Sequence, residues 1–252
     1  LVYQYHHQVS GLYQVYAALI DADTAEVGGA GAFAVTPAPG YQTEPAVACD
    51  GTNCLLVWDQ AQWESQSPGV RATRVSQAGT VLDADGFAVY TPGNLSSLPT
   101  LAQSGHPRVA FDGTNYLVVY ERWPQNLVIQ LAGMRISKAG ILLDGTPATG
   151  GFAVTSNTDG YSVDVTLTFT GTEYWAAWRA GGMNNDYLGG IYGARIGVDG
   201  TIRSPGASGM LMSSPADLYC PAIATNASGG YLAWLKLNYG TAPNQLFGMP
   251  IH

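Results

Sequence analysis

One sequence unit recurs along this chain, and its spacing constrains the fold more than any other feature. The segment "ACDGTNCLLVW" at residues 48–58 returns as "AFDGTNYLVVY" at 110–120 and as "TFTGTEYWAAW" at 168–178. A looser copy, "ATNASGGYLAW", ends at residue 234, and the chain opens on the related "LVY". An aromatic anchor therefore recurs at spacings of 55, 62, 58 and 56 residues, at Tyr3, Trp58, Tyr120, Trp178 and Trp234. Self-similarity with such a period is typical of repeat architectures.

Each full copy predicts a β-hairpin. The central Asp, Gly, Thr and Asn residues tolerate the dihedral angles of a turn, and the apolar run after them predicts a strand. Residues that flank such a turn face one another, as Phe111 and Tyr116 do in the second copy, where a cross-strand aromatic pair is stabilising. The first copy has Cys49 and Cys54 in these places. We therefore expect a disulfide between them, with a reduced apolar pair as the alternative.

The segments around each hairpin extend the unit to four strands. The third strand reads "VRATRVS", "LAGMRIS" and "IYGARIG" in successive copies, and the fourth reads "GFAVYT" and "GFAVTS". Four strands per unit at this period predict an all-β protein, a single β-propeller domain over residues 1–252. Second and third strands occur five times but first and fourth strands only four times, which favours five blades with an incomplete first and last blade. Trimmed termini, or an arc completed by another chain, are the alternatives.

Two of these motifs also carry a family resemblance. The pattern "PRVAFDGTNYLVVY", together with "IYGARIGVDG", resembles repeats in large exported or surface proteins of bacteria, which are generally interpreted as propeller blades. The resemblance covers nearly the whole chain and implies the fold. It implies no activity, because fold does not determine function.

Composition excludes some classes of partner. The net charge is −8 with only 10 Lys and Arg residues, which argues against binding nucleic acid or anionic membranes. No apolar run approaches the roughly 18 residues of a spanning helix, so we expect no membrane insertion. A disulfide and a low lysine content favour a secreted, periplasmic or cell-surface protein. The chain begins within a strand pattern and without Met, so we expect a larger precursor with further domains.

The variable loops form the candidate binding surface. Connections between the second and third strands, and between the fourth strand and the next unit, differ in every copy, whereas the turns at the other end are short and alike. Aromatic rings beside amides and carboxylates suit carbohydrate, because rings cover apolar C–H faces while polar groups bond hydroxyls. For the tyrosines, wedging between blades is the alternative. The candidate ligand-binding residues are Trp63, Trp123, Tyr239, Tyr41, Tyr161 and Tyr219.

A second candidate site emerges from the alignment. The residue just before the first strand is Glu44, His106, Asp164 or Cys220 in successive copies. First strands line the centre of a propeller, so these residues are expected to converge there. All four are metal-ligand types, and they could also supply a thiol nucleophile, a base and carboxylates. Arg108 could neutralise Glu44 and Asp164. The alternative is an ordinary polar channel lining.

Arginine recurs at one position of the third strand, at residues 74, 135 and 195. Recurrence in similar blades indicates a scaffold role. We expect these arginines to pair with acidic neighbours such as Asp59 or Glu121.

No recognised catalytic motif is present, so the sequence supports three hypotheses. The first is a non-enzymatic, lectin-like module that binds carbohydrate or a cell-surface glycan without a cofactor. The second is a metal-binding protein or a glycosidase-like hydrolase, with one metal ion or the Glu44 and Asp164 carboxylates at its centre. The third is a protein-interaction scaffold.

Overall fold

The computed structural model describes the repeats and leaves out most of the variable loops. Described are residues 1–6, 12–21, 23–24, 26–36, 41–61, 68–92, 105–122, 128–156, 160–181, 189–203, 209–213, 218–226, 229–238 and 243–251. Every regular element among them is a β-strand. No helix in this part of the chain has the length and apolar character needed to cross a membrane.

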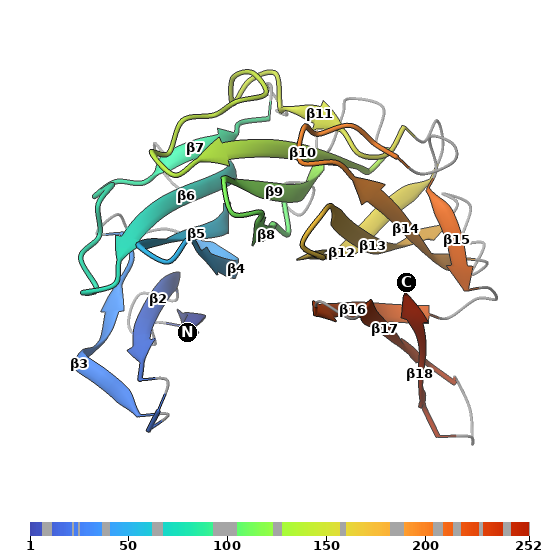
Figure 1. The fold of residues 1–252 in the computed structure, drawn as a ribbon, viewed down its shortest axis with the longest axis horizontal. Helices are drawn as coiled ribbons and strands as arrows, with labels where there is room; N and C mark the ends of the chain where they lie inside the picture. The colour runs from blue at the N-terminus through green and yellow to red at the C-terminus, as the bar shows by residue number, and fades with distance from the viewer. Residues whose placement is uncertain are drawn as a thin grey trace. The chain divides into compact units, whose positions relative to one another are not determined.

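The strands form five antiparallel sheets that follow one another along the chain (Figure 1). The first sheet contains β1 (Val2–His6), β2 (Tyr13–Ile20) and β3 (Val27–Ala34). The second contains β4 (Gln42–Cys49), β5 (Asn53–Gln60), β6 (Gly69–Ser76) and β7 (Phe87–Tyr90). The third contains β8 (Arg108–Phe111), β9 (Asn115–Arg122), β10 (Gln130–Ser137) and β11 (Phe152–Ala153). The fourth contains β12 (Tyr161–Phe169), β13 (Tyr174–Gly181), β14 (Gly190–Ile196) and β15 (Met210–Ser213), and the fifth contains β16 (Leu218–Asn226), β17 (Gly229–Lys236) and β18 (Gln245–Ile251).

This order confirms the four-strand unit. Strands pair with their sequence neighbours in every sheet, as in propeller blades, and the first and last sheets have three strands each among the described residues. Among the described residues, the first sheet has no strand that corresponds to β4, and the last has none that corresponds to β7. The predicted all-β, blade-like architecture is therefore present.

The hairpin turns have the predicted chemistry. Asp50 Oδ1 accepts hydrogen bonds from the backbone N–H groups of Thr52 and Asn53, at 2.8 and 2.7 Å. Directly beside this turn, Cys49 lies opposite Cys54 and is joined to it by a disulfide, as predicted. The corresponding aromatic pairs of the third and fourth sheets have ring centroids 4.9 and 5.0 Å apart, in Phe111–Tyr116 and Phe169–Tyr174.

The chain divides into two compact units, residues 1–118 with 134–151, and residues 119–133 with 152–252. In the first unit, apolar residues of the first sheet pack on the anchor Trp58, which is fully buried. Gly86 lies so close to this ring that a Cβ there would be 2.8 Å from Trp58 Cη2, so only glycine fits. In the second unit, Trp175 and Ile191 of the fourth sheet pack on the anchor Trp234 of the fifth.

The third-strand arginines pair with acidic residues, as predicted, but these acids lie in neighbouring turns. Arg74 pairs with Asp83 rather than with Asp59, with Nη2 2.8 Å from Asp83 Oδ1. The strand register explains the difference, because Asp59 lies opposite Val70 while Arg74 lies opposite Leu55, four residues along β6. The other two arginines likewise pair with acids of neighbouring turns, in Arg135–Asp144 and Arg195–Glu173.

Candidate functional site

A β-bulge interrupts the first strand of three sheets near its start. Between β4 and β5 the register passes from Thr43 opposite Asp59 to Ala46 opposite Val57, so β4 contains one extra residue. The same interruption occurs on β12 and on β16, between Val163 and Thr166 and between Tyr219 and Ala222. Bulges of this kind re-aim side chains and are frequent beside active sites.

One residue in each of these three bulges, and His106 just before β8, share an unusual backbone conformation; we call these four the bulge residues. Glu44, His106, Asp164 and Cys220 have φ angles of 51°, 37°, 57° and 49°, and among the described residues they are the only non-glycine residues with positive φ. An L-residue pays about 1–2 kcal/mol to adopt this left-handed region, whereas glycine enters it freely. The chain has 32 glycines, yet none occupies these positions. When a residue other than glycine is kept in a strained backbone conformation, its side chain is a candidate for a function.

These four residues are the ones that the alignment singled out as equivalent. We call the end of each sheet where they lie the bulge end, and the opposite end, with the hairpin turns, the turn end. Among the described residues no three His, Cys, Asp or Glu side chains are grouped to hold a metal ion. A metal ion bound by the four bulge residues stays a prediction.

In the first unit, Glu44 is held from two directions. Its backbone N–H donates to Gln4 Oε1 on β1, at 3.1 Å. Its carboxylate Oε2 lies 3.7 Å from Arg108 Nη2, and these side chains are 42% and 36% exposed. The predicted neutralisation of Glu44 by Arg108 is therefore present as a loose, solvated ion pair. His106, two residues before Arg108, is half-buried.

In the second unit, Asp164 belongs to a tighter cluster. Its backbone N–H donates to Oε1 of the buried Glu121, at 3.1 Å. Its carboxylate Oδ2 accepts a hydrogen bond from Arg179 Nε, at 2.9 Å. The guanidinium carbon of Arg179 lies 4.7 Å from the ring centroid of Tyr219 and 5.3 Å from that of Tyr161. The partner of Asp164 is thus Arg179, on the neighbouring strand β13.

The six predicted ligand-binding aromatic residues fall into two groups. Tyr161 and Tyr219 are half-buried in the Arg179 cluster, and Tyr41 lies against Tyr13, with ring centroids 6.1 Å apart. The others, Trp63, Trp123 and Tyr239, lie outside the described residues. The remaining bulge residue, Cys220, is exposed and is a free thiol, as expected once Cys49 and Cys54 pair.

The roles of three residues in this arrangement escaped the sequence reasoning, which named Glu121 only as an expected partner of an arginine. Gln4, Glu121 and Arg179 each come directly after an aromatic anchor. The repeat shows that these three residues occupy equivalent positions. It does not show that the side chains of Gln4 and Glu121 accept hydrogen bonds from the bulge residue of the next sheet.

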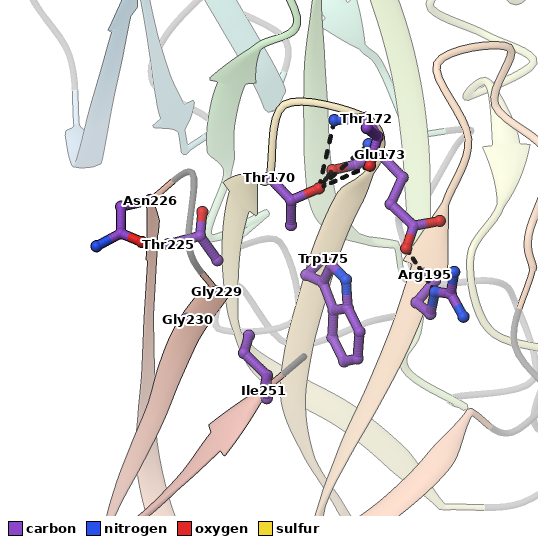
Figure 2. A pocket seen from close by; sticks show the side chains of 10 residues that line it. All are labelled: Thr170, Thr172, Glu173, Trp175, Arg195, Thr225, Asn226, Gly229, Gly230 and Ile251. Atoms are coloured by element: carbon purple, nitrogen blue, oxygen red, sulfur yellow. Dashed lines mark hydrogen bonds and ion pairs between the residues drawn. The ribbon is translucent and has the colours of Figure 1, made fainter.

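A cavity of about 300 Å³ lies at the turn end of the fourth and fifth sheets (Figure 2). The buried carboxylate of Glu173 is 8% exposed and forms ion pairs with Arg195 and Arg203, at 3.8 Å for Oε2 and Arg203 Nη1. The hydrogen bond to Glu173 raises the pKa of Arg195. The lining residues are Thr170, Thr172, Glu173, Trp175, Arg195, Thr225, Asn226, Gly229, Gly230 and Ile251.

The polar groups of this cavity mainly hold one another. The Thr170 hydroxyl donates to the backbone oxygen of Glu173 at 2.9 Å, and the Thr225 hydroxyl donates to that of Phe169 at 3.0 Å. Figure 2 shows the Glu173 side chain directed towards Arg195 and away from Thr225. The cavity is therefore a polar junction between two sheets, and the bulge end is the better candidate for a site.

Comparison with known proteins gives a fold and no family. No family model matches the chain, and no curated protein matches it. A crystal structure of a thermostable family-43 glycoside hydrolase aligns with a TM-score of 0.52 at 11% identity, over 96% of this chain and 82% of that chain. The endo-arabinase from Bacteroides thetaiotaomicron VPI-5482 aligns with a TM-score of 0.49 at 12% identity, over 100% and 93% of the two chains. At such identities the alignment with the family-43 enzyme indicates a shared fold only.

Proposed function

We propose that this protein binds carbohydrate at the bulge end of its sheets. The observation that carries the proposal is the set of four side chains kept in left-handed backbone at equivalent positions. Glycine would relieve this strain at all four positions, so the side chains themselves are the feature to explain.

The chemistry at the bulge end suits a sugar. Asp164 accepts hydrogen bonds, Arg179 donates them, and the rings of Tyr161 and Tyr219 lie beside both. Such a mixture bonds hydroxyls and covers apolar C–H faces. The shared fold with a family-43 glycoside hydrolase supports carbohydrate as the ligand class. The loop residues Trp63, Trp123 and Tyr239 are proposed to extend the same surface.

Closure into a five-bladed ring belongs to the same proposal. Five consecutive sheets with three-stranded first and last members support it. A closed ring would bring the four bulge residues to one mouth of a central channel. A compact 252-residue domain has a radius of gyration of about 18 Å, which small-angle X-ray scattering can measure. A clearly larger value for the monomer would contradict closure.

Export is proposed as well, with a secreted, periplasmic or cell-surface location. The Cys49–Cys54 disulfide supports it, because disulfides persist mainly in oxidising compartments. Comparing free thiols in protein recovered from a reducing and an oxidising compartment would test whether the bond needs such a location.

Glycoside hydrolysis is the second candidate, favoured by the shared fold and by the two carboxylates among the bulge residues. Binding alone is the stronger proposal, because the carboxylates of Glu44 and Asp164 are each already engaged in an ion pair with an arginine. Turnover of aryl glycosides or polysaccharides that Glu44→Gln and Asp164→Asn both abolish would favour hydrolysis.

The test of the binding proposal is a glycan array followed by titration calorimetry with the best ligand. Tyr219→Ala should weaken binding about tenfold, equivalent to 1.4 kcal/mol. The matched control is Tyr231→Ala, which removes an exposed tyrosine from β17 on the neighbouring strand and should leave affinity unchanged. A chain that retains no glycan, or equal losses for the two variants, would contradict the proposal.

A further inference from the structure

The residue after the aromatic anchor has a recurring structural task, and of the four sheets that are followed by another sheet, the fourth departs from it. Gln4 and Glu121 each provide a side-chain oxygen that accepts the backbone N–H of the next sheet's bulge residue, both at 3.1 Å. Asp59, also an acceptor, occupies the same place in the second sheet. The fourth sheet has Arg179 there, and an arginine side chain has no acceptor. Arg179 therefore cannot perform the scaffold task.

The surroundings of Arg179 fix its orientation. Nε is bound to Asp164 Oδ2 at 2.9 Å, and two tyrosine rings lie within 5.3 Å of the guanidinium carbon. The side chain is 23% exposed, so most of its flexible stem is covered. A cation held by a carboxylate and by aromatic rings has lost most of its rotamer freedom before any ligand arrives.

The outer edge of this guanidinium is not used by the described part of the chain. Nη1 and Nη2 of Arg179 make no hydrogen bond or ion pair with any described residue. The scaffold arginine Arg74 differs, because its Nε and Nη2 both bind Asp83 and its Nη1 donates to the backbone oxygen of Lys138. The contrast separates an arginine whose donors complete the fold from one with two nitrogen donors that bond no described residue.

We propose that Arg179 binds the carboxylate of an acidic sugar, so that the ligands of the bulge end are saccharides containing uronic acid. This inference rests on the carbohydrate function proposed above. The two Nη groups form a planar pair of donors that matches the two oxygens of a carboxylate. Because that geometry needs two parallel N–H bonds, lysine cannot replace it.

The overall acidity of the protein does not prevent such binding. The net charge of −8 repels an acidic ligand at long range. At physiological salt, however, this repulsion is screened beyond about 8 Å, whereas a direct bidentate contact is much shorter. We therefore expect association with an acidic saccharide to become faster as salt is raised moderately.

The experiment compares matched pairs of oligosaccharides on the full chain. Each pair consists of a uronic acid oligomer, such as galacturonate, glucuronate or mannuronate, and its carboxyl-reduced neutral counterpart. At least one acid form should bind about tenfold or more tightly than its neutral form. Arg179→Lys should remove this preference, and Arg203→Lys, which alters an arginine at the turn end, should preserve it.

The outcomes separate the two proposals. Equal binding of acid and neutral forms would overturn the role of Arg179 and leave the carbohydrate function standing. No binding of any glycan would overturn both. The comparison of paired ligands on the unaltered chain keeps the test valid even if the Arg179 variant does not fold.

Discussion

The two ends of the sheets follow opposite rules. At the turn end, positive φ angles occur at glycine, and charged groups are matched with one another, as in Arg74–Asp83. At the bulge end, positive φ occurs also at the non-glycine residues Glu44, His106, Asp164 and Cys220, and Nη1 and Nη2 of Arg179 bond no described residue. The turn end has the features of a stability element, whereas the bulge end retains strain together with chemically active side chains.

This contrast predicts that changes at the turn end reduce stability. The largest loss should follow Cys49→Ala with Cys54→Ala, because the disulfide restricts the unfolded chain. The chain-entropy relation gives about 2 kcal/mol for so short a loop. Substituting the aromatic pair of the other copies, in Cys49→Phe with Cys54→Tyr, should recover about 1 kcal/mol of this. Denaturant unfolding measures both, and an aromatic variant no better than the alanine variant would contradict the equivalence of the copies.

The junction around Glu173 gives the next prediction. Glu173→Gln removes the charge that Arg195 and Arg203 share and should lower the unfolding free energy by about 1.5–2 kcal/mol. Glu26→Gln, at an exposed carboxylate, is the control and should change it by less than about 0.5 kcal/mol. Equal midpoints for both variants in thermal unfolding would show that the ion pairs of Glu173 with Arg195 and Arg203 add nothing to stability.

Backbone strain at the bulge end predicts a reversed ranking of glycine and alanine. Cys220→Gly should be more stable than Cys220→Ala by about 1 kcal/mol, because alanine keeps the left-handed strain. On the same strand, Ala222→Gly should lower the free energy of unfolding by about 0.4–1 kcal/mol, which is the usual effect of replacing alanine with glycine. Chemical denaturation measures the free energy of unfolding of each variant. If Cys220→Ala were more stable than Cys220→Gly, the result would argue against the left-handed conformation at position 220.

The smallest effect concerns pH. Hydrogen bonds from Arg74 lower the pKa of Asp83 below its usual value. A carboxyl group whose pKa is lowered by folding adds stability above its unfolded pKa of about 3.9, and that stability disappears as pH falls through the folded pKa. Asp83→Asn should therefore cost about 1 kcal/mol or less at pH 7 and nothing at pH 2. If the melting temperatures of Asp83→Asn and of the unaltered chain differed by the same amount at pH 7 and at pH 2, the stabilising role of the ionised Asp83 would be contradicted.

Much of the fold was predictable because the repeat constrains it repeatedly. The hairpin turns, the Cys49–Cys54 pair and the incomplete first and last sheets all follow from aligned copies and strand periodicity. The acidic partner of Arg74 was not predictable from the sequence. Alignment shows which residues are equivalent, but it does not show which positions of neighbouring strands lie opposite one another.

The candidate site was predictable only in part. Alignment identified Glu44, His106, Asp164 and Cys220, but their left-handed backbone has little sequence signal, since positive φ is signalled mainly by glycine and only weakly by residues such as Asp and His. The role of Arg179 was missed because it depends on contacts with Asp164 and Tyr161 of β12 and with Tyr219 of β16, which are far apart in the sequence.

The central claim is that the four bulge side chains are kept for binding, against their own backbone preference. The most direct measurement is glycan affinity of a variant with glycine at positions 44, 106, 164 and 220, beside its circular dichroism spectrum and unfolding midpoint. We predict a β-sheet spectrum like that of the unaltered chain and loss of glycan binding. A folded variant that binds glycan with unchanged affinity would contradict the account.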